Sequence, residues 1–200
     1  MTRSIALSSA FLVAVMCAAA DVRAQTVEVA PFVGLGFGGP LVLPAIDEAF
    51  SIRSGVTYGV TVDLPIAPMW RFEALYSRQE SRASSASAGV SLGLDVERYR
   101  AGVQEEEAWR DVRFFGTFLA GATRFVPSGY DSEIWFSIAV GLGVKTFPTN
   151  RIGLRFDARG FYTPVMIGGA AMCGNGRCAF AYTGSGVFQG DVSGGVIVVF

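Results

Sequence analysis

The residues that most often carry enzyme chemistry are scarce in this sequence. Its 200 residues include no histidine and three cysteines, and Lys145 is the only lysine. A Ser–His hydrolase mechanism would lack its general base, because histidine is the usual proton acceptor near neutral pH. A Ser–Lys mechanism is conceivable, but nothing in the sequence places a serine nucleophile beside Lys145. We therefore predict that the chain is not an enzyme.

Two short motifs suggest ligand binding at first sight. The glycine-rich segment 34–39 has the composition of a phosphate loop, but Pro40 and Pro44 prevent the helix that must follow such a loop. Cys173 and Cys178 are a poor zinc site, because zinc takes about four nitrogen or sulfur ligands and the chain has no imidazole. We predict no cofactor and no metal. In an oxidising compartment these two cysteines are expected to form a disulfide that stiffens one loop.

The closing segment, residues 186–200, shows the pattern that organises the whole chain. Every second residue from Phe188 to Val198 lacks a polar side chain, whereas the positions between them include Gln189, Asp191 and Ser193. Alternation with a period of two predicts a strand that has an apolar surround on one face and a polar one on the other. A strand that ends on an aromatic residue is typical of a membrane barrel, where aromatic side chains are favoured at the bilayer interface.

The same alternation recurs in seven earlier segments, which predicts eight strands in all. We expect them near residues 26–38, 56–64, 70–77, 94–104, 112–125, 134–147, 151–162 and 186–200. The connections alternate between longer ones (39–51, 79–91, 126–133, 163–185) and short ones (65–68, 105–109, 148–150). An even strand number with longer loops at one end and short turns at the other is typical of outer-membrane barrels. The predicted fold is therefore all-β, an eight-stranded antiparallel up-and-down transmembrane β-barrel.

The segment 94–104 fits this pattern least well. Arg98 and Arg100 interrupt the apolar face that Leu94 and Val96 begin. We therefore expect a β-bulge here, or a strand whose upper half stands above the membrane.

Residues 1–24 have the three regions of a secretory signal peptide. Arg3 supplies the positive charge, residues 5–20 are apolar or small, and Val22-Arg23-Ala24 offers a cleavage site. We expect the barrel domain to occupy residues 25–200, with no helical membrane span, because no run of about 18 apolar residues follows the signal. The 16 basic and 17 acidic residues nearly cancel, which gives no electrostatic reason to expect a nucleic acid partner.

Ser193-x-Gly195-x-x-Val198-x-Phe200 resembles the C-terminal signal that the assembly machinery of bacterial outer membranes reads. Segments 29–34 (VAPFVG), 75–79 (LYSRQ) and 151–155 (RIGLR) resemble recurring parts of small OmpA/OmpX-like outer-membrane β-barrel domain proteins. The resemblance implies a bacterial outer-membrane protein with both termini in the periplasm. It also implies three partners, namely membrane lipid, lipopolysaccharide and the assembly machinery. The family is known for its fold more than for one activity, so no ligand or surface partner follows.

The charged residues on the predicted inner face have two possible roles. These residues are Glu28, Asp63, Arg71, Glu73, Lys145, Arg155, Asp157, Arg159 and Asp191. They could line a polar conduit or pack into an ionic network. Because an eight-stranded barrel is only about wide enough for its own side chains, we favour the network.

Three functions stay open at this point. A non-enzymatic envelope protein with a plugged lumen is favoured, and a narrow channel for small or apolar solutes is the first alternative. The second alternative is an adhesin that binds through loops 79–91 and 163–185. On the outer face, four aromatic residues besides Phe200 are predicted to lie at the membrane interfaces. These are Trp70, Tyr76, Tyr162 and Phe188.

Overall fold

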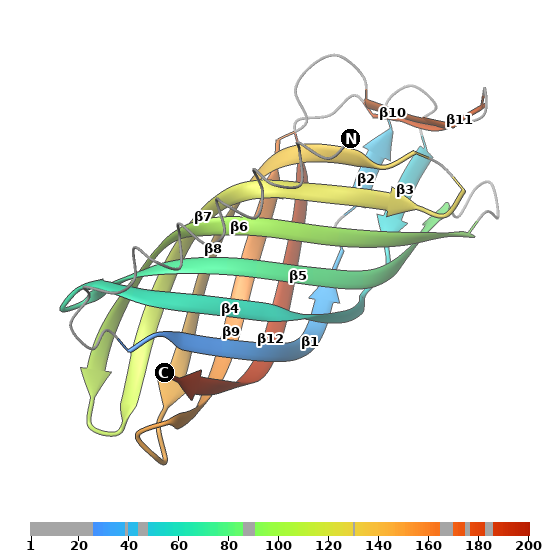
Figure 1. Cartoon of the computed structure of the whole chain (residues 1–200). Coiled ribbons are helices and arrows are strands. Elements are labelled where there is room, and N and C mark those ends of the chain that lie inside the picture. The colour runs from blue at the N-terminus through green and yellow to red at the C-terminus, as the bar shows by residue number, and fades with distance from the viewer. Residues whose placement is uncertain are drawn as a thin grey trace, which may run out of the picture.

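The computed structural model describes residues 26–38, 40–43, 48–85, 91–129, 131–164, 170–174, 177–182 and 186–200. Eight long antiparallel strands wrap into a closed barrel (Figure 1). They are β1 (Glu28–Phe37), β4 (Gly55–Ala67), β5 (Trp70–Ser85), β6 (Ser91–Trp109), β7 (Val112–Pro127), β8 (Glu133–Thr146), β9 (Ile152–Thr163) and β12 (Val187–Val199). The predicted eight-stranded barrel is thus confirmed. The predicted signal peptide, residues 1–24, lies outside the described residues.

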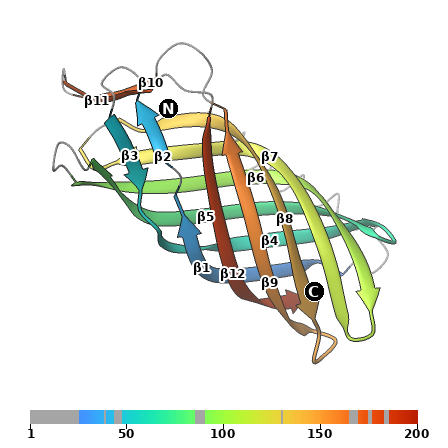
Figure 2. The same cartoon turned by 180° about the vertical axis from the view of Figure 1, so that it is seen from behind.

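Each of these strands pairs with the next one along the chain, and the last pairs with the first. β12 lies between β9 and β1, as Figure 2 shows from behind, and its register with β1 joins Val198 to Val29. The backbone hydrogen bond from Phe200 N to Val27 O, at 3.0 Å, continues this seam to the last residue. Closure matters because an open sheet edge in a bilayer would leave backbone groups without hydrogen-bond partners.

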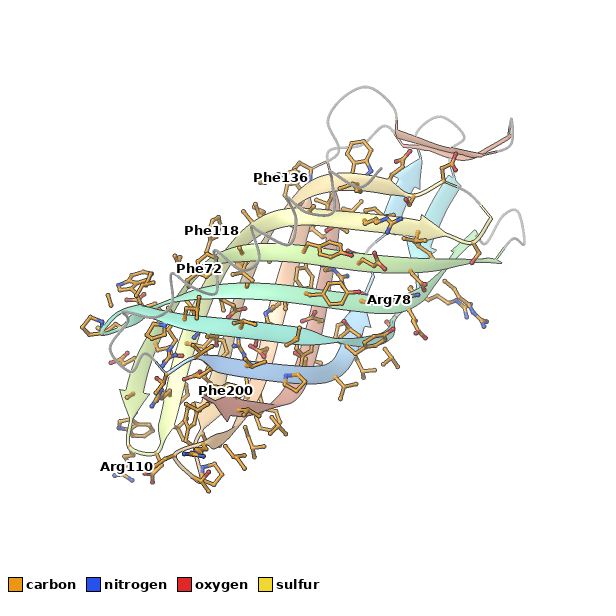
Figure 3. The ribbon with its side chains drawn as sticks, viewed as in Figure 1. Phe72, Arg78, Arg110, Phe118, Phe136 and Phe200 are labelled. Carbon is orange, nitrogen blue, oxygen red and sulfur yellow. The ribbon has the colours of Figure 1, made fainter. Side chains whose placement is uncertain are left out.

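Strict alternation separates the inside of the barrel from its outer wall. On β9 the odd-numbered Gly153, Arg155 and Asp157 are buried, whereas Ile152 and Phe156 are 50% and 55% exposed. The outer wall is therefore apolar, and outward side chains such as Phe72, Phe118 and Phe136 surround the barrel in Figure 3. The described residues include no helix that is long and apolar enough to cross a membrane.

The two ends of the barrel differ in construction. At one end the strands join through short turns, including Arg110–Asp111 between β6 and β7 (Figure 3). At the other end β2 (Pro40–Leu43) and β3 (Glu48–Ile52) form a hairpin, and β3 pairs with the end of β5. A second hairpin, β10 (Ala170–Gly174) with β11 (Arg177–Tyr182), lies at the same end. We call these the turn end and the hairpin end.

The predicted long loops are therefore partly wrong. Strands occupy parts of segments 39–51 and 163–185, and β5 and β6 pair as far as Ser84 and Ser91 inside the predicted loop 79–91. Segment 79–91 was predicted to be a loop because its composition is polar. A strand that extends beyond the apolar region needs only backbone pairing, and serine or charged side chains do not prevent that pairing.

The structure also corrects the prediction for segment 94–104. β6 runs from Ser91 to Trp109 and pairs with β5 and β7 without a register shift, so it contains no bulge. Arg98 and Arg100 lie on the inner face together with Leu94 and Val96. The turn predicted at 105–109 is strand, and the chain reverses at Arg110, whose φ is +56°. The alternation was intact, but the inner face of β6 is apolar in one part and charged in another.

Glycines at tight places in the wall allow a direct test of this packing. A Cβ at Gly121 would lie 2.0 Å from the backbone oxygen of Tyr99, whereas a Cβ at Gly116 on the same strand would meet nothing nearer than 4.0 Å. We expect Gly121→Ala to lower the free energy of unfolding by about 1 to 3 kcal/mol, as overpacking does. Urea unfolding in detergent measures the loss. Gly116→Ala is the matched control, and equal losses in the two variants would contradict the register of β6 and β7.

Candidate functional site

The interior of the barrel is the candidate site, because the charged residues gather there. All nine inner-face residues named from the sequence are buried, with at most 8% of their surface exposed. They are Glu28, Asp63, Arg71, Glu73, Lys145, Arg155, Asp157, Arg159 and Asp191. Eight of them form ion pairs with one another or with two further residues, Glu106 and Arg113. Asp191 forms no ion pair within 4.0 Å among the described residues, although the charge of Arg159 acts on it.

Lys145 on β8 is the centre of the first half of the network. Its Nζ donates hydrogen bonds to Glu28 Oε2 at 2.8 Å, to Asp63 Oδ2 at 2.7 Å and to Glu106 Oε1. The side chain of Lys145 is fully buried. Oxygen atoms of the three carboxylates lie within 4.8 Å of one another, a spacing that would suit a metal ion. In this structure the ammonium group contacts all three carboxylates, so it supplies the positive charge at that position.

Arg155 on β9 is the centre of the second half. Its guanidinium reaches Asp63 Oδ2 and Glu73 Oε2 at 2.7 Å each, and Asp157 at 3.0 Å. Arg159 contacts the same two carboxylates, Glu73 at 3.3 Å and Asp157 at 3.0 Å. Because Asp63 and Glu73 come from β4 and β5, these ion pairs cross the lumen between strands that are not neighbours in the sheet.

Two members of the network, Glu106 and Arg113, were missed in the sequence. Arg71 contacts Glu28 at 3.0 Å and Glu106 at 2.9 Å. Arg113 reaches the same two carboxylates at 3.5 and 3.7 Å, with 39% of its side chain exposed. Glu106 was assigned to a turn, although it has the same parity as Gln104 on the inner face of β6. Continuing each strand's alternation to its last residue would have found both Glu106 and Arg113.

The network is balanced in charge. Its cations are Arg71, Arg113, Lys145, Arg155 and Arg159, and its carboxylates are Glu28, Asp63, Glu73, Glu106 and Asp157. Five positive charges thus meet five negative ones. Buried charges are tolerated when they are paired, and each of these ten has at least one ion-pair partner. We call this set the turn-end network.

Arg98 and Arg100 form a second polar section, which the sequence analysis did not include among the site residues. Arg98 Nη2 donates to the side-chain oxygens of Gln79 at 2.7 Å and Gln189 at 3.1 Å. Arg100 Nη2 donates to the hydroxyls of Thr123 and Ser137, both at 2.9 Å. Both guanidinium groups lie against the ring of Phe161, 4.6 and 4.5 Å from its centroid. Cation–π contacts of this kind stabilise a buried cation but do not neutralise it.

An apolar belt lies between the walls near the middle of the barrel. It consists of Phe32, Leu75, Leu119, Ala139 and Phe161, all buried and in contact. The lumen is therefore filled by side chains of both kinds, as the width of an eight-stranded barrel requires.

The remaining predicted sites fall on the wall and at the ends. Cys173 and Cys178 are Cα partners across the β10–β11 hairpin, and the disulfide between them stays a prediction. In the predicted assembly signal, Ser193 faces inwards, whereas Val198 and Phe200 face outwards and Phe200 is 75% exposed. Gly195 lies opposite Phe32 of β1.

Exposed aromatic side chains occur along the outer wall and include the predicted interface residues Trp70, Phe188 and Phe200. Trp70 is 41% exposed at the start of β5, beside the turn end. Towards the other end Tyr162 packs on Phe188 with a centroid distance of 4.6 Å, and Tyr76 packs on Tyr99 at 5.1 Å. That these residues lie at the two membrane interfaces stays a prediction.

The completed barrel is similar to several solved structures. Neisserial surface protein A matches with a TM-score of 0.64 and 14% identity over 87% of this chain and 97% of that one. The chain has the fold of small outer-membrane β-barrels. OprG of Pseudomonas aeruginosa matches at a TM-score of 0.54 with 10% identity, covering 88% of this chain and 97% of OprG. Ail, the attachment invasion locus protein of Yersinia pestis, in complex with the heparin analogue sucrose octasulfate, matches at 0.51 with 13% identity, covering 88% and 99%.

These similarities concern the barrel fold and not the residues inside it. No protein-family model matches the sequence, and no curated protein matches it either. At identities of 10 to 14%, the lumen residues of this barrel have to be interpreted from their own contacts.

Proposed function

We propose that this barrel is a non-enzymatic integral protein of the outer membrane of a Gram-negative bacterium, with a lumen closed by its own side chains. It would support the envelope or present its hairpin end to the outside. Outer-membrane lipid and lipopolysaccharide would surround the wall, and the assembly machinery would read the last strand up to Phe200. The apolar outer wall and its exposed aromatic side chains support the membrane location.

The turn-end network carries the proposal of a closed lumen. Its ion pairs join side chains from seven of the eight barrel strands, and the guanidinium of Arg155 contacts carboxylates on opposite walls. Its members other than Arg113 are almost completely withdrawn from solvent. A hydrated pathway would have to separate these pairs, and breaking one buried pair costs about 3 to 5 kcal/mol.

The proposed orientation places the turn end in the periplasm. Outer-membrane barrels have short turns on the periplasmic side and longer extensions outside. Val27 and Phe200 are hydrogen-bonded neighbours, and β1 starts and β12 ends at the turn end, so both of these chain ends would lie on the periplasmic side.

Conductance in a planar lipid bilayer tests the closed lumen. We expect the folded wild-type protein to show no steady conductance steps, because no continuous hydrated path crosses the turn-end network. A shift in gel mobility between unheated and boiled samples in SDS verifies that the inserted protein is a folded barrel. Reproducible steps from such a sample would contradict the proposal and favour the narrow channel.

Surface binding remains a prediction that rests on the hairpin end. Of the predicted loops, residues 86–90, 165–169, 175–176 and 183–185 lie outside the described residues. The contacts of the described residues therefore identify no ligand for the adhesin role.

A further inference from the structure

The second polar section carries a charge that the protein does not neutralise. Arg98 and Arg100 have 0% and 4% of their surface exposed, and neither has a carboxylate of the described residues within 4.0 Å. Asp191, buried to 3% exposure, is the described carboxylate whose charge acts on both, and the charge of Arg159 from the turn-end network acts on Asp191 as well. Since the turn-end network is balanced within itself, two cations here face one anion. The section is one negative charge short.

Several donors in this section also have no partner among the described residues. The Nε and Nη1 atoms of Arg98 and of Arg100 donate to no group, and neither does the Nε2 of Gln79 or of Gln189. Each buried unsatisfied donor costs about 1 to 3 kcal/mol, and more when it is charged. Water molecules could satisfy the hydrogen bonds, but they cannot supply the missing negative charge.

The section is closed at both ends, so bulk solvent does not screen this charge. On the side of the hairpin end, Leu94 and Val96 of β6 and Phe125 of β7 cover the section. All three are at most 6% exposed. Towards the turn end lie the apolar belt and the balanced network. In such surroundings an uncompensated charge destabilises the folded state.

We propose that this section binds one monovalent inorganic anion of about the size of chloride, held between the free donors of Arg98 and Arg100. Two guanidinium groups and two carboxamide nitrogens offer the donors without partners, and one bound anion would make the barrel interior neutral. Asp191 limits the site to a single negative charge, because a second anion would face two like charges, Asp191 and the first anion, in a closed space. The anion is a structural counter-ion and is not transported.

The test measures unfolding of the purified, folded barrel in detergent as a function of bromide concentration. Sodium gluconate, whose anion is too large for the closed section, keeps the ionic strength constant. One bound ion predicts that a tenfold increase in bromide above its dissociation constant lowers the unfolding constant about tenfold. Arg98→Gln removes one of the two cations, so this dependence is expected to disappear. Asp191→Asn raises the local positive charge, so the dependence is expected to begin at lower bromide.

Arg151→Gln is the matched control, because Arg151 is exposed at the turn end, and it should keep the wild-type dependence. A crystal grown with bromide provides a second readout that needs no variant, with an anomalous peak expected beside Arg98 and Arg100. An unfolding constant that does not depend on bromide would overturn the proposal, and so would a crystal without that peak. If Arg98→Gln does not fold, the wild-type titration and the crystal decide the question alone.

Discussion

Lys145→Met should lower the free energy of unfolding by about 3 to 5 kcal/mol, because it breaks three buried ion pairs and unbalances the charge of the network. Methionine keeps most of the volume of lysine but removes the ammonium that contacts Glu28, Asp63 and Glu106. Glu28 and Glu106 keep Arg71, and Asp63 keeps Arg155, so the variant leaves the buried network with one uncompensated negative charge. The three carboxylates would then repel one another in a site that is almost withdrawn from water. The midpoint of urea unfolding in detergent, followed by gel mobility, measures the loss.

The same variant provides a second readout that a general packing defect would not change. Without the ammonium, three carboxylates have oxygen atoms within 4.8 Å of one another. Such a group of oxygen ligands suits a hard divalent cation, so Ca²⁺ should restore part of the stability of Lys145→Met and leave the wild type unchanged. Arg151→Met, at an exposed position, is the control and should cost little. A Lys145→Met variant as stable as the wild type would show that the ion pairs around Lys145 do not hold the barrel together.

Arg155→Ala should open the lumen. We expect it to change function more than Lys145→Met does. Arg155 contacts three carboxylates across the barrel, Asp63, Glu73 and Asp157, so truncation removes both the bridging guanidinium and its volume. Water can then enter between strands that the wild type holds together. We expect steady conductance steps in planar bilayers, with a preference for cations, because the three carboxylates remain in the path.

Arg113→Ala is the matched control for this measurement. Arg113 belongs to the same network, but its contacts are longer, at 3.5 and 3.7 Å, and 39% of its side chain is exposed at the turn end. Its loss should leave the ion pairs of Arg155 intact, so the Arg113→Ala barrel should show no conductance steps. If folded Arg155→Ala also shows no conductance steps, closure of the lumen is due to the apolar belt around Phe32 and Phe161 and not to the ion pairs.

Strand number, strand order and the two faces of each strand were predictable, because all three depend on local alternation. On β9 and β12 the parity of a few residues is enough to separate the inner face from the wall, and the barrel has these residues on the faces expected. The errors occurred where the polarity of a side chain does not match the face or the element in which the residue lies. On β6 the inner face changes from Leu94 and Val96 to Arg98 and Arg100, so side-chain polarity no longer marks the side. At the hairpin end, the polar ends of β5 and β6 and four short strands were mistaken for loops, because backbone pairing leaves little trace in composition.

The sequence by itself determined a closed barrel of eight strands with charged residues on its inner face, because alternation with a period of two is set by the geometry of a single strand. Only the tertiary structure decided which of those charges meet. Lys145 and Glu28 are 117 positions apart, and Arg98 and Gln189 are 91 apart, so their contacts depend on the register of every strand between them. The same closure left Arg98 and Arg100 without a carboxylate within ion-pair distance, since a stagger of one pair of residues in any ladder would have changed their neighbours.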